Sequence, residues 1–170
     1  MSKALVLSIL LGFNLQFSPS MSESLLKRVG VIYEATKFIG LKYKSRFENY
    51  ILDCSGFTKL VFGSCEIDIP RTSVSQKEKG YKVINIEDVA PGDLLIFRGR
   101  NAKSSRPGHT AIAHHWSNDT LYFIHSSVSK GITIDHIHSP YWKKRFIEAR
   151  NIIDDVAVSE DKNKVLTNAN

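Results

Sequence analysis

The stretch DCSGFTKLVFG at residues 53–63 decides how the rest of the chain is interpreted. Asp53 is a residue type that caps helix N-termini, apolar residues follow, and Gly63 is a typical helix stop. The pattern predicts a helix that starts at Asp53 or Cys54 and ends at Phe62. A cysteine in the first helical turn lies where unpaired backbone N–H groups and the helix dipole favour the thiolate, the nucleophilic form. Cys54 is therefore a candidate nucleophile.

A longer helix is predicted upstream of this stretch. Apolar residues recur at helical spacing from Leu25 to Ile39, and residues 20–23 have the Ser-x-x-Glu pattern of a capping box. These signals predict a helix over about Ser22–Phe38 that stops near Gly40. Residues 41–52 are expected to form a loop.

Downstream of Gly80 the apolar pattern changes to short runs rich in Val, Ile, Phe and Tyr, which turn signals separate. The predicted strands are Tyr81–Ile86, Asp93–Phe97, His109–Trp116, Thr120–Ser126, Gly131–Asp135 and Phe146–Ile152. Two helices followed by about six strands predict an α+β domain, with N-terminal helices packed on a mainly antiparallel sheet.

A cysteine nucleophile needs a base, and the base needs a partner on its second ring nitrogen. His109 opens one predicted strand, His125 lies near the end of the next, and the two strands form a predicted hairpin around Asn118-Asp119. In such a hairpin the start of one strand lies opposite the end of the other, with Cβ atoms ~5 Å apart. The spacing therefore predicts a His109–His125 contact.

The remaining histidines are interpreted as surface or hydrogen-bonded residues: His114, His115, His136 and His138. A zinc site would need clustered ligands at a recognisable spacing, such as His-Glu-x-x-His, and the chain has no such motif. No metal ligand and no cofactor are predicted.

The ordered series of motifs resembles the NlpC family of bacterial cell-wall cysteine peptidases over roughly residues 24–152. The matching segments are Asp53–Phe57, Pro70–Ser73 with Gln76, Pro91–Phe97, Gly108–Ile112, Phe123–Ser127, Gly131–Ile134, Pro140–Trp142 and Arg145–Phe146. Relatives usually carry a glycine pair where this chain has Lys44-Ser45-Arg46-Phe47. The substrate-recognition loop is therefore expected to differ.

The resemblance implies a papain-like fold and a cysteine endopeptidase that cuts peptidoglycan stem peptides through a thioester acyl-enzyme. Cys54 would attack the amide carbonyl, His109 would take and return the proton, and His125 would hold the imidazole. The expected bond joins D-glutamate to the diamino acid. The resemblance further implies that the substrate-binding residues are Tyr43, Asp53, Ser55 and Arg71.

The N-terminal segment indicates export. Lys3 precedes the apolar run Ala4–Phe13, and small and polar residues follow, so residues 1–20 are predicted to be a signal peptide rather than a buried N-terminal element. The run is too short to span a bilayer comfortably. Residues 21–153 are the predicted peptidase domain, and the polar residues 154–170 are a predicted flexible tail. The protein is expected in the periplasm, in the cell envelope or secreted, without stable membrane insertion after signal removal.

Composition limits the partners. A length of 170 residues suits one domain, and the default is a monomer. The formal net charge is +6, but the basic clusters Arg98–Arg106 and Lys143–Arg145 lack interleaved aromatic residues, so nucleic acid is not a predicted partner. Cys54 and Cys65 are expected to lie roughly 16 Å apart on or near one helix, beyond disulfide reach.

Three other functions stay open at this stage. The same fold could serve a secreted amidase, acyltransferase or toxin that acts on another amide substrate. It could also be a non-catalytic module that binds wall peptides, which predicts an unreactive Cys54. A zinc hydrolase would be inhibited by chelators and not by thiol reagents.

Overall fold

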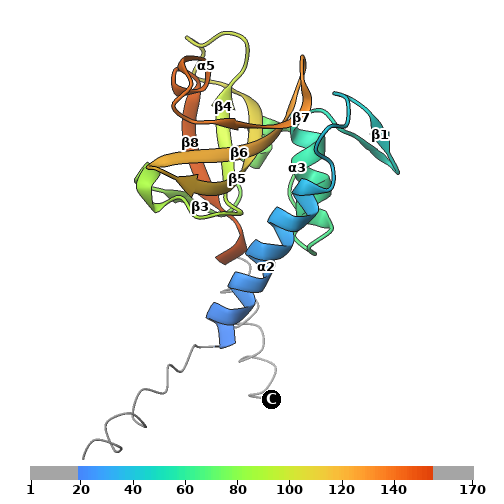
Figure 1. The fold of residues 1–170 in the computed structure, drawn as a ribbon, viewed down its shortest axis with the longest axis vertical. Helices are drawn as coiled ribbons and strands as arrows, with labels where there is room; N and C mark the ends of the chain where they lie inside the picture. Colours follow the sequence, from blue (N-terminus) through green and yellow to red (C-terminus); the bar gives the residue numbers. More distant parts are fainter. Residues whose placement is uncertain (1–18, 155–170) are drawn as a thin grey trace, which may run out of the picture.

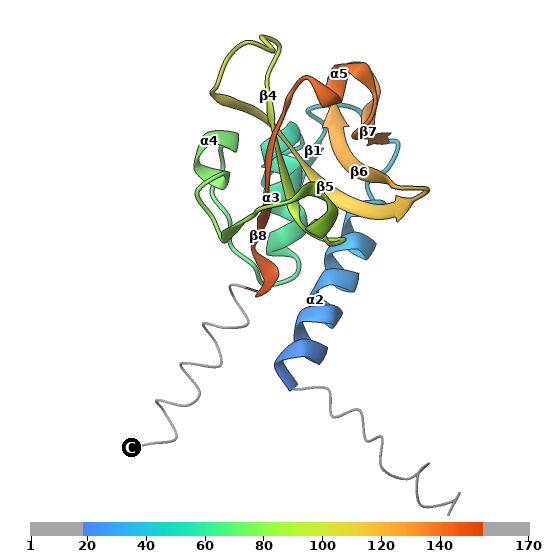
Figure 2. The same ribbon diagram turned by 90° about the vertical axis from the view of Figure 1, so that its left-hand side faces the viewer.

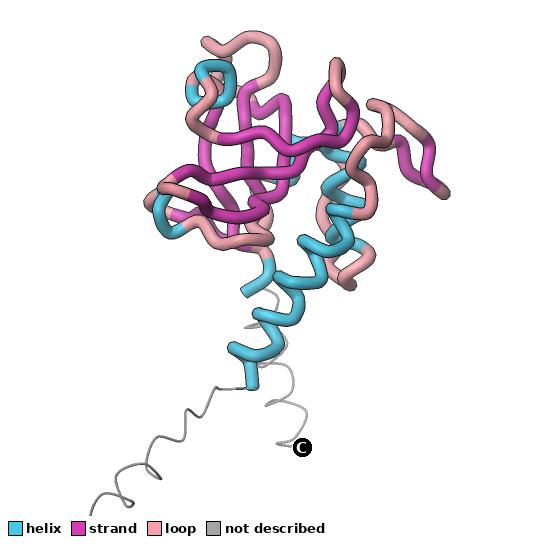
Figure 3. Tube along the Cα trace, in the orientation of Figure 1, coloured by secondary structure: helices cyan, strands magenta, loops and turns pink. Residues whose placement is uncertain are grey.

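Helix α2 (Pro19–Thr36) and helix α3 (Cys54–Gly63) lie on one side of a six-stranded sheet (Figure 1). The computed structural model describes residues 19–154, with the side chains of Pro19 and Ser20 left out. Figure 3 shows the strands of this sheet gathered into one body, with α2, α3 and a separate short hairpin outside it. The predicted α+β fold is confirmed.

All neighbouring strands of the large sheet run antiparallel, in the order β3-β8-β4-β5-β6-β7. Its strands are β3 (Tyr81–Val83), β4 (Leu94–Arg98), β5 (Pro107–Ser117), β6 (Thr120–Ser127), β7 (Gly131–His136) and β8 (Phe146–Asn151). The shorter elements are β1 (Arg46–Phe47), β2 (Tyr50–Ile51), α4 (Ser73–Gln76), the 3-10 helix η1 (Ile86–Asp88) and α5 (Pro140–Lys143).

The sheet is buried on both faces. Along β4, Leu94 and Ile96 pack against the helices, whereas Leu95 and Phe97 pack into a second apolar cluster on the far face, with Trp142 of α5. This two-sided burial explains why β4 reads as a continuous apolar run rather than as an alternating pattern. The central strands are therefore held rigidly on both sides.

Several element boundaries differ from those predicted. Helix α2 already contains Ser20, so the capping-box pattern does not mark its start. The expected loop at residues 41–52 contains the β1–β2 hairpin, and the strand expected over Tyr81–Ile86 ends at Val83, before η1 begins. Pieces of two to four residues carry no period that a sequence pattern could reveal.

The structure describes only small parts of the predicted signal peptide and of the predicted tail. Nearly all of the predicted signal peptide and of the predicted tail lies outside residues 19–154. Asp154 is described and is bound by Ser24 and Arg28 of α2. Within the described part, no helix is both long and apolar enough to cross a membrane.

Helix α5 and the loop between β4 and β5 lie at the end of the molecule away from the start of α2, in both views (Figures 1 and 2). Arg145, just after α5, joins the two by donating from Nε to the Gly99 carbonyl at 3.2 Å and from Nη2 to the Arg100 carbonyl at 3.0 Å. These contacts build one wall of the pocket described next.

Candidate active site

Cys54 is the first residue of α3 and is partly buried. Asp53 caps the helix, because its Oδ1 accepts a hydrogen bond from the Gly56 N–H at 2.8 Å. Burial raises the pKa of the Cys54 thiol, while the backbone N–H groups of Thr110 and Ser55 act in the opposite direction. The resting form is therefore a thiol, with backbone donors placed to receive the thiolate.

Gly56 lets the chain before α3 pass against the helix start. A Cβ atom at this position would lie 2.0 Å from the carbonyl oxygen of Ile51, which no side chain can tolerate. Glycine is therefore required here by close backbone approach and not by an unusual φ angle. The contact holds the segment that leads into Cys54.

His109 and His125 are joined side chain to side chain. His109 Nε2 lies 3.1 Å from His125 Nδ1, with the two rings nearly edge to face. The register that pairs Ile112 with Ile124 makes the two histidines diagonal neighbours rather than directly opposed residues. Because Nε2 of His109 is taken up by His125, its Nδ1 is the nitrogen left for another partner.

Trp142 covers this pair of histidines. Its ring stacks on His109 with centroids 5.0 Å apart and an angle of 29°, and it meets His125 edge to face at 4.8 Å. Desolvation by the surrounding side chains lowers the pKa of His109 below its ordinary value of 6.5, and the neighbouring His125 lowers it further. A neutral imidazole is the form that can accept a proton.

Asp135, at the end of β7, was not predicted as a site residue. Its Oδ2 lies 3.1 Å from His125 Nε2 and accepts from Trp142 Nε1 at 3.0 Å, while Lys130 Nζ donates to Oδ1 at 2.9 Å. The register pairs His125 with Thr133, so Asp135 is its diagonal neighbour on the same face. A predicted β6–β7 register could have found it.

The predicted catalytic residues share one pocket of about 560 Å³. Cys54, His109 and His125 all line it, together with Tyr43 and Asp135. Its lining also includes three cationic side chains, Arg98, Arg100 and Lys130. The pocket therefore combines a nucleophile, a histidine pair and positive charge.

The predicted residues Asp53, Ser55 and Arg71 do not line this pocket. Arg71 Nη2 lies 2.7 Å from Asp53 Oδ2, and Arg71 Nη1 donates to Ser55 Oγ at 3.0 Å. Desolvation tends to raise the pKa of Asp53, but the bonds from Arg71 and Gly56 hold it below its ordinary value. These side chains bond to one another and stabilise the start of α3.

Helix α3 is also tied to β5 and to the segment before α4 by buried polar side chains. Gln76 donates to the carbonyls of Ser55 and Pro70 at 2.9 and 2.8 Å, and its Oε1 accepts from Thr58 Oγ1 at 3.0 Å. Thr58 lies 3.4 Å from the hydroxyl of Thr110, the residue after His109. This network sets the position of Cys54 relative to the strand that carries His109.

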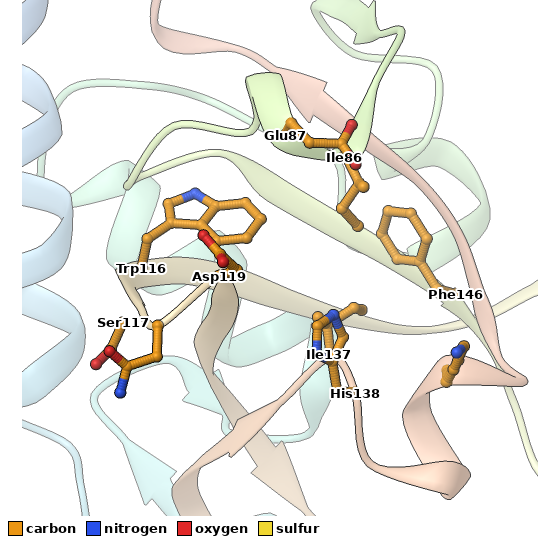
Figure 4. Close-up of a pocket in the computed structure, with 10 residues that line it drawn as sticks. Ile86, Glu87, Trp116, Ser117, Asp119, Ile137, His138 and Phe146 are labelled. Atoms are coloured by element: carbon orange, nitrogen blue, oxygen red, sulfur yellow. The ribbon is translucent and has the colours of Figure 1, made fainter.

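A larger hollow of about 770 Å³ lies around the β5–β6 turn and η1 (Figure 4). Its lining is mostly apolar and includes Ile86, Trp116 and Phe146, and none of the predicted catalytic residues is part of it.

Cys54 and Cys65 are both free thiols. Within residues 19–154, no group of three or more His, Cys, Asp or Glu side chains is arranged to hold a metal ion.

The chain is similar in sequence to known proteins. A family model described as the NlpC/P60 family matches residues 40–151. The chain is 35% identical over 103 residues to the murein DD-endopeptidase MepS/murein LD-carboxypeptidase of Escherichia coli (strain K12), covering 60% of this chain and 50% of that protein. It is 32% identical over 138 residues to the gamma-DL-glutamyl hydrolase of Bacillus subtilis (strain 168), covering 76% of this chain and 31% of that protein.

The fold has solved relatives as well. An NlpC/P60 family protein from Bacillus cereus ATCC 10987 superposes with a TM-score of 0.61 at 27% identity, over 74% of this chain and 40% of that chain. The chain therefore spans about half, or less, of the length of these relatives.

Proposed function

The chain belongs to the NlpC/P60 family, and from this premise we propose that it is a cysteine endopeptidase acting on the stem peptides of peptidoglycan. The observation that carries the proposal is the shared pocket of Cys54 and the His109–His125 pair. One relative is named as a murein endopeptidase, which agrees with this substrate class.

The proposed reaction begins with transfer of the Cys54 proton to Nδ1 of His109. The thiolate attacks the amide carbonyl, and the backbone N–H of Cys54 at the helix start stabilises the oxyanion. His109 then gives its proton to the leaving amine, which leaves a thioester on Cys54. A water molecule attacks the thioester while His109 takes its proton, the acid product leaves, and His109 returns that proton to the Cys54 thiolate. His125 holds the His109 ring throughout.

We propose that the bond cut joins D-glutamate to the diamino acid of the stem. Arg98, Arg100 and Lys130 give the pocket a positive lining, which suits the free carboxylates of such a stem. Tyr43 also lines the pocket and is proposed to contact substrate directly. Asp53, Ser55 and Arg71 are proposed to act on substrate binding through the position of α3, given their mutual bonds.

We further propose that the protein works outside the cytoplasm as a monomer, in the periplasm, in the cell envelope or secreted. The supporting observation is the order of charge and hydropathy in residues 1–20. The murein substrate in the name of a relative agrees with this location.

Digestion of purified peptidoglycan and of a short stem peptide tests the proposal, with products read by mass spectrometry. We expect the wild type to cut and Cys54→Ala to lose activity at least about 1,000-fold, because the nucleophile is gone. Cys65→Ala is the matched control and is expected to cut at the wild-type rate. Undiminished cleavage by Cys54→Ala would disprove the role of this cysteine. A wild type that cuts neither substrate would disprove the substrate class, and products from another bond would disprove the proposed bond.

A further inference from the structure

The chain of hydrogen bonds that starts at His109 does not end at His125. The next link is Asp135, whose Oδ2 lies 3.1 Å from His125 Nε2. The side chain of His125 is only 1% exposed, so this carboxylate faces an imidazole that is almost fully removed from water. Charge-assisted bonds in such surroundings are stronger than the same bonds at a surface.

The carboxylate determines which ring nitrogens carry protons. An ionised aspartate can only accept, so His125 must hold its proton on Nε2 to bond Asp135. Nδ1 of His125 is then a lone pair, and His109 must donate to it from Nε2. That assignment leaves Nδ1 of His109 unprotonated, which is the state that can take the proton of Cys54.

We propose that Asp135 is a positioning residue for this site: its carboxylate sets the tautomers of His125 and His109 and stabilises the imidazolium that forms when Cys54 is deprotonated. The inference rests on the proposed function for the identity of the reaction. The reactivity of the Cys54 thiol tests it without any peptide substrate.

The surroundings of Asp135 hold it in the required form. The bond from His125 is the largest influence that keeps the pKa of Asp135 below its ordinary value, and bonds from Lys130 and Trp142 act in the same direction. Trp142 Nε1 and His125 Nε2 share Oδ2, while Lys130 occupies Oδ1. The carboxylate is therefore bound on both oxygens and cannot rotate away from His125 without losing a partner.

Other titratable and charged groups line the same pocket and contribute to the electrostatic environment of Asp135. They come from the segment before β1, from α3, from β4 and the loop after it, from β5 and β6, from the β6–β7 turn and from α5. In chain order they are Tyr43, Cys54, Arg98, Arg100, His109, His125, Lys130 and Tyr141. Asp135 is the one carboxylate among the pocket-lining residues of the described chain.

Alkylation of the full-length protein by iodoacetamide over a range of pH provides the test, with Cys54 and Cys65 quantified separately by mass spectrometry. In the reaction the Cys54 proton passes to His109 and the sulfur displaces iodide. Asp135→Asn should slow Cys54 alkylation near pH 7 by roughly 10- to 100-fold and move its pH profile upward, while Cys65 is unaffected. The asparagine side chain cannot reproduce the bonds of Asp135. In one orientation its NH₂ group faces the donor Lys130, and in the other it faces the donors Trp142 and His125.

Two variants separate positioning from a general loss of structure. Asp119→Asn, in the turn at the opposite end of the β5–β6 hairpin, is the matched control and should keep the wild-type profile. In a His125→Asn background the link to Asp135 is already broken, so adding Asp135→Asn should have no further effect. A wild-type profile in Asp135→Asn, or an equal loss in both backgrounds, would overturn the proposal.

A measurement on the unmodified protein does not depend on how the variants fold. Nitrogen-15 NMR of the imidazole rings reports which nitrogen of His125 is protonated. We expect the proton on Nε2 of His125 and on Nε2 of His109 at neutral pH. A proton on Nδ1 of His125 would overturn the proposal. Because neither readout uses peptidoglycan, failure of the substrate proposal would leave this test unaffected.

Discussion

The neutral imidazole of His109 links the chemistry of the site to the stability of the fold. Desolvation lowers its pKa in the folded protein, whereas the unfolded chain has the ordinary value of 6.5. Below pH 6.5 the unfolded state therefore binds more protons than the folded state. The free energy of unfolding must fall as pH decreases from about 6.5 towards the folded-state pKa, by up to about 1.4 kcal/mol for each pH unit.

Replacing His109 by glutamine should remove this acid sensitivity. We expect the free energy of unfolding of His109→Gln to change less between pH 6.5 and pH 4.5 than that of the wild type, measured by urea denaturation. His138→Gln, which replaces an exposed histidine, is the matched control and should keep the wild-type slope. Equal slopes in the wild type and His109→Gln would contradict the assigned direction. Asp135 does not interfere, because its own lowered pKa affects stability only below about pH 4.

The residues of the site differ in how far the sequence could predict them. Local signals, a helix start and a strand start, predict Cys54 and His109 as site residues, and the length of one hairpin predicts His125. Asp135 needed the register of a second hairpin as well, and small errors of register accumulate from strand to strand. Arg71 is predicted to bind substrate by family resemblance, and no local pattern reveals its ion pair with Asp53.

At the scale of single elements, the start of α3 depends on the absence of a side chain at Gly56. Gly56→Ala would drive a Cβ atom against the carbonyl of Ile51, so we expect a loss of stability of about 3 kcal/mol or more. Gly63→Ala, at the end of the same helix, is the matched control. Its Cβ would meet only Tyr50 at 3.8 Å, and alanine favours helix by up to about 1 kcal/mol. Urea denaturation of the two variants gives the comparison, and similar stabilities would contradict the close-approach argument.

Elements long enough to show a period were predicted, and shorter ones were not. The two main helices and the strands β4 to β8 each contain enough apolar residues to reveal spacing, whereas β3 has only three residues. Helices α4 and α5 comprise four residues each, and the strands β1 and β2 comprise two. Their formation depends on caps such as Thr72 and Ser139 and on tertiary contacts, which hydropathy does not encode.

At the scale of the whole molecule, one arginine joins the N-terminal helix to the sheet and to the end of the described chain. Arg28 Nη1 lies 2.9 Å from Asp93 Oδ1 and donates to the Pro91 carbonyl, also at 2.9 Å, while Nη2 lies 3.0 Å from Asp154 Oδ2. The side chain of Asp93 is only 1% exposed. Burial raises the pKa of Asp93, and Arg28 opposes that rise.

Removing this arginine should lower the free energy of unfolding far more than removing a surface charge does. We expect Arg28→Met to lower the free energy of unfolding by about 3 kcal/mol at pH 7, because it leaves the Asp93 carboxylate buried without a counter-charge. Lys37→Met, which removes a surface pair with Glu34, should leave the free energy of unfolding close to the wild-type value. Without Arg28 the pKa of Asp93 rises further, so Asp93 takes up a proton more readily and is no longer a buried charge. The difference in free energy of unfolding between the wild type and Arg28→Met should therefore be smaller at pH 5 than at pH 7. A stability difference that is larger at pH 5 than at pH 7 would contradict the role of Arg28 as the counter-charge of Asp93.

The layered α+β arrangement was predictable at this scale, because helices followed by strands have few ways to pack. The second apolar cluster was not. The sequence suggested helices on a sheet, but it did not indicate that η1 and α5 would cover the far face and bring Trp142 to the histidines. That placement depends on contacts of Trp142 with strands β4, β5 and β6, which are distant in the sequence and which no local pattern contains.

The position of Trp142 has an optical consequence. Indole emission is quenched by a nearby protonated imidazole, and Trp142 touches both His109 and His125. The chain has two tryptophans, and the second, Trp116, lies on the hollow beside the β5–β6 turn. In a Trp116→Phe protein the tryptophan emission would therefore come from Trp142 alone, beside the histidine pair. Its emission would report the ionisation of the site in real time, without label, substrate or inhibitor.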